Sequence, residues 1–157
     1  MPDLFSPYKL KGVTLRSRIA MSPMTMYRSV DGLMNYHVML MGSRAAGGFG
    51  LVFPKQLAIT PDGRAGTHCA GVYDDSQIGG LSRTTAMVKA MGAMPAAQLG
   101  HTGRKGSEWK PWDGKLQISP EHPDGWQAFS LAAHSDHRLT KMSSLPEWRL
   151  KSAQLAN

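Results

Sequence analysis

The sequence predicts an α/β fold in which short parallel strands alternate with helices, the arrangement that opens a (β/α)8 barrel. Three observations support it: short apolar runs end in loops, helix-length segments separate these runs, and glycine punctuates the transitions. Right-handed crossovers then place the strands parallel in one sheet. A complete barrel needs about 250 residues. The 157 residues here therefore predict a partial TIM barrel, made of an amino-terminal hairpin and about three βα strands.

The first elements are a hairpin and a short buried strand. Tyr8–Leu10 and Val13–Leu15 flank a Lys-Gly turn, which is typical of two short antiparallel strands. Residues 18–21 form the first strand of the expected barrel, and this strand ends at Ser22-Pro23 because proline removes a ladder donor.

A helix and a second strand follow. The apolar spacing predicts a helix over Asn35–Ala46, with Asn35 as its cap and two glycines as its stop. Residues 51–53 are continuously apolar, as expected of a strand covered on both faces. Pro54 interrupts the continuation of this strand toward Ile59.

The third βα unit is followed by a long excursion. We predict a turn at residues 60–63, a helix over residues 75–91 and a strand over residues 94–99. The helix face is expected to carry Ile78, Leu81, Thr85 and Val88. After Lys105 the tryptophans, prolines and glycines indicate a loop excursion, and periodicity fades beyond Gln127.

Composition indicates an ordered domain and argues against several functions. The chain is 41% hydrophobic and 18% charged, and no run approaches the roughly 18 apolar residues of a membrane span. The amino terminus lacks a leader pattern and Cys69 is the sole cysteine, so we expect a cytoplasmic protein without membrane contact. The +7 net charge is scattered, which favours a solvated basic surface over nucleic-acid binding. His68 beside Cys69 is not enough to predict a metal site.

Polar residues cluster where the predicted strands end, which is where parallel α/β folds bind ligands. Ser22 follows strand one, Lys55 and Gln56 follow the apolar run of strand two, and Gln98 and His101 close strand three. A buried glutamine is costly unless its amide is hydrogen-bonded. A flat heteroaromatic ring with carbonyl and imide edges would satisfy it.

Four segments in register resemble the old yellow enzyme family of FMN-dependent ene-reductases, particularly its thermophilic-like branch. They are RIAMSPMTMY at residues 18–27, GSRAAGGFGLV at 42–52, PDGR at 61–64 and QLGHTGRK at 98–105. Agreement runs from about Leu4 to Gly125. Each motif is weak alone, but their shared order and spacing predict membership of the amino-terminal portion of this family.

The resemblance implies a flavin pocket. It implies that FMN is contacted by six residues: Ser22, Pro23, Met24, Thr25, Gln56 and Gln98. Gln98 would bind the pyrimidine edge, and Tyr27 would face the substrate. Thr25 stands where this branch often has cysteine, and a hydroxyl near the flavin O4 shifts the reduction potential. The implied reaction is reduction of FMN by NADH or NADPH, then hydride transfer to an activated alkene.

Part of the family pattern is missing. We assign no catalytic residue, because the family's substrate-holding histidines lie further along and His134 and His137 come too early. We therefore divide the chain into residues 1–128, the barrel portion, and residues 129–157, a divergent tail that a truncation or shifted frame would explain. Open strand edges predict pairing with another copy or a companion chain.

Other functions remain as alternatives. The first is an inactive truncated fragment or interaction module without stable flavin binding. The second is a basic nucleic-acid-binding module. The third, another βα-barrel lyase or aldolase, has no identifiable Schiff-base lysine or metal set.

Overall fold

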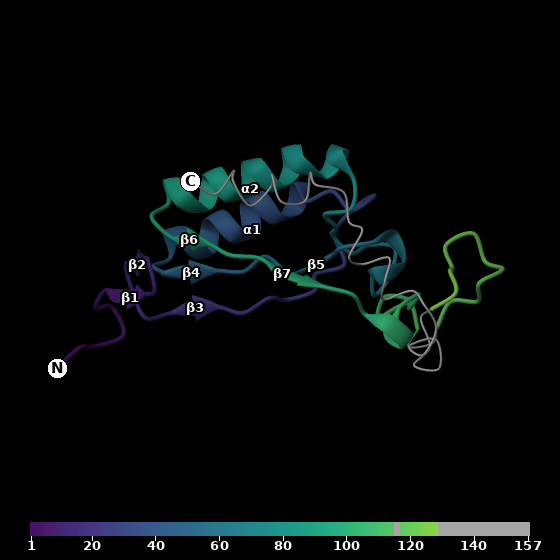
Figure 1. The fold of residues 1–157 in the computed structure, drawn as a ribbon, viewed down its shortest axis with the longest axis horizontal. Coiled ribbons are helices and arrows are strands. Elements are labelled where there is room, and N and C mark those ends of the chain that lie inside the picture. The colour runs from purple at the N-terminus through teal and green to yellow at the C-terminus, as the bar shows by residue number, and fades with distance from the viewer. Residues whose placement is uncertain (115–116, 129–157) are drawn as a thin grey trace.

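The computed structural model describes residues 1–114 and 117–128. It consists of a small amino-terminal hairpin, a layer of short strands, and two helices that cover one face of those strands (Figure 1). The divergent tail, with His134 and His137, lies outside the described residues.

The hairpin forms as predicted. Strands β1 (Tyr8–Leu10) and β2 (Val13–Leu15) pair antiparallel, with Tyr8 opposite Leu15. Lys11 adopts a left-handed conformation with φ 51° in the turn. Only Leu15 is buried, so the hairpin lies at the edge of the structure (Figure 1).

The predicted parallel sheet is present, but its second and third strands are each broken in two. Strands β3 (Ala20–Met21), β4 (Leu51–Val52) and β6 (Met94–Pro95) form one parallel sheet in the order β3-β4-β6. Further along the same chain segments, β5 (Gln56–Ala58) and β7 (Gln98–Gly100) form a parallel pair. This is the strand order with which a (β/α)8 barrel begins.

The break between β4 and β5 acts as a β-bulge, so that Lys55 and Gln56 point to opposite faces of the strand. Val52 pairs with Pro95 and Gln56 pairs with Gln98, so three residues on one segment face two on the other. A one-residue offset in a strand exchanges the two faces. Lys55 is consequently buried at 2% exposure, while Gln56 is half-buried at the open side.

Helix α1 (Asn35–Ala46) has the predicted bounds but a different cap. Met34 occupies the N-cap position without a side-chain hydrogen bond, so the prediction of an Asn35 cap is wrong. Asn35 is the first helical residue, and its Oδ1 accepts a hydrogen bond of 2.6 Å from Arg83 in the neighbouring helix. The asparagine therefore joins the two helices.

Helix α2 (Ile78–Ala90) follows a 3-10 turn at Asp75–Gln77. Asp74 and Gln77 form a capping box, which starts this segment in spite of the glycines that follow. Most of the predicted face is confirmed: Val88 is buried, Leu81 packs against a buried cluster and Thr85 is half-buried, with Gly80 and Thr84 buried beside them. Ile78 is exposed, because the helix turns its glycine side toward Met34 for close approach.

The core lies between the helices and the sheet. Helices α1 and α2 run side by side over one sheet face (Figure 1). They bury a methionine-rich cluster of seven residues: Met21, Leu40, Met41, Ala45, Val52, Val88 and Ala93. The opposite face, which a barrel would enclose, is left open, with Ala20 exposed and Leu51 half-buried. In the described part of the chain, none of the helices is long and apolar enough to span a bilayer.

Candidate functional site

The three loops that follow the strands at their carboxyl ends meet on one side of the sheet. Ser29 from the loop after β3 exchanges contacts with His68 from the loop after β5: the Ser29 amide donates to the His68 carbonyl at 3.2 Å. The loop after β7 joins them through Thr102, whose hydroxyl donates to the Arg64 carbonyl at 2.8 Å. The Glu108 amide donates to the Ala65 carbonyl at 2.8 Å. These bonds hold the loops as one framework.

Six residues predicted to contact the flavin lie along this open side. Ser22, Met24, Thr25 and Gln98 are exposed, and Pro23 and Gln56 are half-buried. Ser22–Thr25 lie in the loop that directly follows β3, Gln56 begins β5 and Gln98 begins β7. The two glutamines are brought together by the β5–β7 pairing, and the surfaces of the four loop residues are accessible in whole or in part.

Gln56 and Gln98 form the most defined part of this set. They are direct partners in the β5–β7 register, so their amides project from adjacent strands. The Gln56 side chain lies over Gly100, where a Cβ would come 2.4 Å from its Nε2. Neither amide has a hydrogen-bond partner among residues 1–114 and 117–128. Hydrogen-bond donors and acceptors are therefore both available to a planar ligand with carbonyl and imide edges.

Tyr27 connects this set to a neighbouring pocket. It is half-buried, has φ 52°, and packs edge-on against Trp112 with ring centroids 5.6 Å apart. Burial raises the pKa of its phenol, and the nearby Cys69 thiol and Glu108 carboxylate raise the pKa further. The phenol is accordingly a protonated hydrogen-bond donor at neutral pH.

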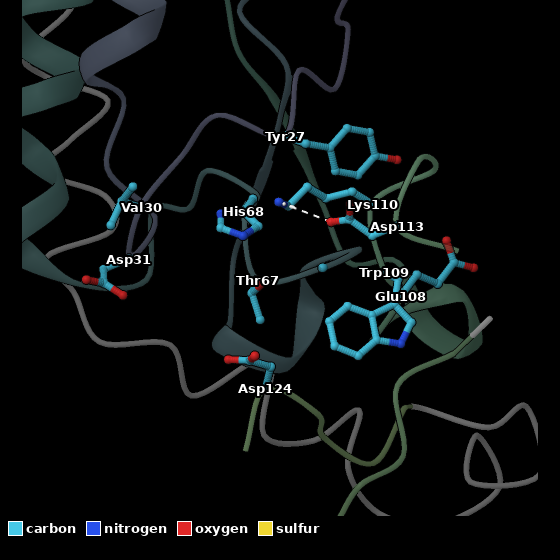
Figure 2. Close-up of a pocket in the computed structure, with 11 residues that line it drawn as sticks. Tyr27, Val30, Asp31, Thr67, His68, Glu108, Trp109, Lys110, Asp113 and Asp124 are labelled. Carbon is cyan, nitrogen blue, oxygen red and sulfur yellow. Dashed lines mark ion pairs between the residues drawn. The ribbon is translucent and has the colours of Figure 1, made fainter. Parts of the chain in front are cut away.

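The pocket beside Tyr27 is enclosed by all three loops (Figure 2). Its volume of about 330 Å³ lies at the lower end of the range for small-molecule sites. Its lining includes Thr67, His68, Trp109 and Lys110. Sequence reasoning missed this pocket, since it treated the segment after Lys105 as an excursion. The available signal was the density of tryptophan and charged residues in that segment.

His101 and Arg104 form contacts within the loop that follows β7. His101 Nδ1 accepts a hydrogen bond of 3.0 Å from the Gly103 amide, and its Nε2 lies 3.7 Å from Asp62 Oδ2. The Arg104 carbonyl accepts from Gln117 at 3.4 Å. Both residues thereby stabilise the turn after β7.

Two basic residues, His37 on α1 and Lys55 directly before β5, are buried in the fold. His37 on α1 is fully buried, and neither ring nitrogen has a hydrogen-bond partner within the described residues. Burial, followed by the positive charge of Lys55, lowers the pKa of His37 to about 4. Among the residues that the structure describes, no carboxylate lies within ion-pair distance of Lys55. The stem of Lys55 is therefore packed in the interior without an ion pair to hold its end.

Comparison with known proteins identifies the lineage. Residues 3–143 match the model of the NADH:flavin oxidoreductase / NADH oxidase family. The chain belongs to this family. The resemblance to old yellow enzymes is thereby confirmed, and the four motifs on which it rests all lie within the matched range.

Solved structures of this family share the fold. Morphinone reductase in complex with tetrahydroNAD is 31% identical over 76% of this chain and 33% of its own, with a TM-score of 0.63. The old yellow enzyme from Trypanosoma cruzi is 26% identical over 85% of this chain and 36% of its own, also with a TM-score of 0.63. The chain spans about a third of these relatives, which confirms a partial TIM barrel.

Proposed function

We propose that this chain forms one wall of the FMN pocket of an NAD(P)H-dependent oxidoreductase that reduces activated alkenes. The observation that carries the proposal is the pairing of Gln56 with Gln98 on adjacent strands, with no hydrogen-bond partner for either side-chain amide among residues 1–114 and 117–128. Family membership supports flavin-dependent oxidoreduction in general. The choice of FMN and of an alkene acceptor is what the resemblance of the four motifs to the old yellow enzyme family implies.

The residues present fit a flavin. Ser22, Pro23, Met24 and Thr25 offer an accessible surface after β3, with a proline and a methionine to pack against a planar ring. Gln98 would donate to and accept from the pyrimidine edge, and Gln56 would approach from the second strand. Gly100 leaves room for the Gln56 amide to lie flat at this position.

The flavin supplies the redox chemistry, which is the transfer of a hydride from the nicotinamide to the alkene. The chain's own residues would position the flavin and the substrate and polarise them by hydrogen bonds. The Thr25 hydroxyl would donate a hydrogen bond near the flavin O4. Tyr27, held protonated by its raised pKa, would donate a hydrogen bond to a polar group of the substrate.

The first test is retention of flavin by the purified full chain. The chain is incubated with FMN, desalted and examined for absorption near ~450 nm, the usual flavin band. We expect retained FMN that NADH or NADPH bleaches anaerobically. A colourless protein would overturn the proposal for this chain and favour the inactive fragment or interaction module.

A pair of glutamine variants locates the site. We expect Gln98→Ala and Gln56→Ala each to weaken FMN binding about tenfold, the effect of losing one good hydrogen bond. Gln127→Ala is the matched control, because Gln127 is an exposed glutamine outside the set. Equal affinity in all three variants would place the flavin elsewhere.

A further inference from the structure

We propose that the pocket beside Tyr27 recognises a positively charged group, so that the preferred alkene substrates carry an ammonium centre. The substrate part rests on the proposed function. The recognition of a cation rests only on the pocket, which the family assignment does not describe.

The pocket is placed to receive a distal part of a substrate. Its walls come from the loops after β3, β5 and β7, which lie at the carboxyl side of the sheet (Figure 2). Tyr27 belongs both to this lining and to the predicted substrate position. A molecule that contacts Tyr27 from the flavin side could therefore extend a substituent into the pocket.

The lining is acidic, although the chain as a whole is basic. Asp31, Glu108, Asp113 and Asp124 line the pocket, against the single basic side chain of Lys110 besides His68. The net charge of the chain is +7. The local sign is thus opposite to the global one, and a cleft lined by one sign of charge concentrates the opposite ion. Glu108 is close enough to Tyr27 to raise the pKa of its phenol.

Aromatic walls complete a site for a soft cation. Tyr27 and Trp109 both line the pocket, and Trp109 is held edge-on by His122 with ring centroids 5.1 Å apart. Aromatic faces combined with carboxylates are the surroundings in which quaternary ammonium groups bind. A carboxylate ligand would instead be repelled by the four acidic side chains.

The chain already places one ammonium here. Lys110 reaches across the pocket in Figure 2, and its Nζ lies 3.2 Å from Asp113 Oδ2. A ligand cation would share or take over this carboxylate. Removing the Lys110 charge should therefore strengthen cation binding, whereas removing an acidic charge should weaken it.

The backbone around the pocket is held in uncommon conformations. Tyr27 and Asp31, which line it, and Ser107, which precedes Glu108, have φ values of 52°, 50° and 59°. Left-handed backbone at non-glycine residues is energetically costly and is concentrated at functional sites. Three of the four such residues in the described chain surround this pocket.

The test compares choline with its uncharged isostere 3,3-dimethylbutan-1-ol on the full chain, with and without FMN. Binding is followed by the tryptophan indole NMR signals, since Trp109 lines the pocket. We expect choline to bind at least about tenfold more tightly at low salt, and added salt to weaken it. Equal binding of the two probes, or no shift of the Trp109 signal, would overturn the inference.

Charge variants with opposite expected signs sharpen the test. Glu108→Gln should weaken choline about threefold, and Lys110→Met should strengthen it about threefold. Glu121→Gln is the control, because Glu121 is exposed and outside the lining. The same direction of change in Glu108→Gln and Lys110→Met would contradict electrostatic recognition.

The flavin readout separates this inference from the proposed function. If choline binds but FMN is not retained, cation recognition stands and the oxidoreductase proposal fails. If FMN is retained but choline does not bind, the inference fails alone. With retained FMN, an enone bearing a trimethylammonium group should show a higher kcat/KM than its tert-butyl isostere. Glu108→Gln should reduce the preference, which is the kcat/KM of the charged enone divided by that of the isostere. A preference that Glu108→Gln leaves unchanged would contradict the substrate assignment.

Discussion

The two ends of the sheet differ in how completely their polar groups are satisfied. At the amino end, Arg16 donates hydrogen bonds to the carbonyls of Phe49, Ala45 and Met91, which ties the ends of both helices to the sheet. At the carboxyl end, the Gln56 and Gln98 amides have no partner among the described residues. The comparison indicates that one end of a partial barrel stabilises the fold while the other is kept available for binding.

Replacing Arg16 should give the largest loss of stability. Arg16→Met removes three hydrogen bonds from a charged donor to carbonyls at and just beyond the ends of α1 and α2, which should cost about 4 kcal/mol of unfolding free energy. The measurement is urea denaturation of the full chain. Arg18→Met is the control, because the Arg18 side chain makes a cation–π contact with Tyr8 at 5.0 Å and no hydrogen bond within the described residues. Equal losses of unfolding free energy in Arg16→Met and Arg18→Met would contradict a special stabilising role of the amino end of the sheet.

Acid should destabilise the fold through the buried His37. Its folded-state pKa of about 4 lies below the ordinary 6.5, so between these values the unfolded chain binds the proton more readily. Stability is therefore constant above about pH 6.5 and falls as the pH drops toward 4. The expected loss between pH 7 and pH 5 is about 2 kcal/mol.

A variant without the imidazole isolates this effect. His37→Leu keeps an apolar side chain of similar size and removes the titrating group, so its stability should change less between pH 7 and pH 5. Denaturation curves at both pH values measure the difference. If the unfolding free energy falls equally between pH 7 and pH 5 in the parent chain and in His37→Leu, other groups cause the acid sensitivity.

Local pattern predicted most of the elements. The hairpin and the bounds of α1 follow from turn glycines and apolar spacing, which act over a few residues. The cap of α1 was wrong because Asn35 binds Arg83, 48 residues away, in place of its own helix end. The face of α2 was predicted except at Ile78, which is exposed because Gly80 gives a close approach to Met34 that hydrophobicity alone does not reveal.

The candidate site likewise divides into features that local pattern predicts and features that depend on tertiary contacts. The motifs identified Tyr27 and Gln98, the position after the apolar run of strand two identified Gln56, and the register places the two glutamines side by side. Nothing local showed that Lys55 turns inward, since this depends on the extra residue in one strand. The pocket around Trp109 depends on three loops meeting, which is a tertiary property.

Replacing the buried residue Lys55 by an uncharged one should stabilise the chain, the opposite sign from Arg16. Lys55→Met keeps an unbranched apolar stem and removes an ammonium that has no countercharge within the described residues. We expect a gain of about 1–2 kcal/mol in urea denaturation. The pKa of His37 should also rise, because Lys55 is one of the two causes that lower it. A loss of stability would show that Lys55 has a favourable partner.

The smallest stability effect should come from Thr25, at the binding end. Its side chain is exposed and has no hydrogen-bond partner among residues 1–114 and 117–128, so Thr25→Val should change the unfolding free energy by less than about 0.5 kcal/mol. If the hydroxyl lies near the flavin O4, the same variant should shift the reduction potential of retained FMN, measured by anaerobic dye equilibration. A stability loss as large as that of Arg16→Met would contradict the division between a stabilising end and a binding end, because it would show that Thr25 supports the fold. A shifted potential with unchanged stability would show that the carboxyl edge can be altered for chemistry without loss of the fold that Arg16 secures.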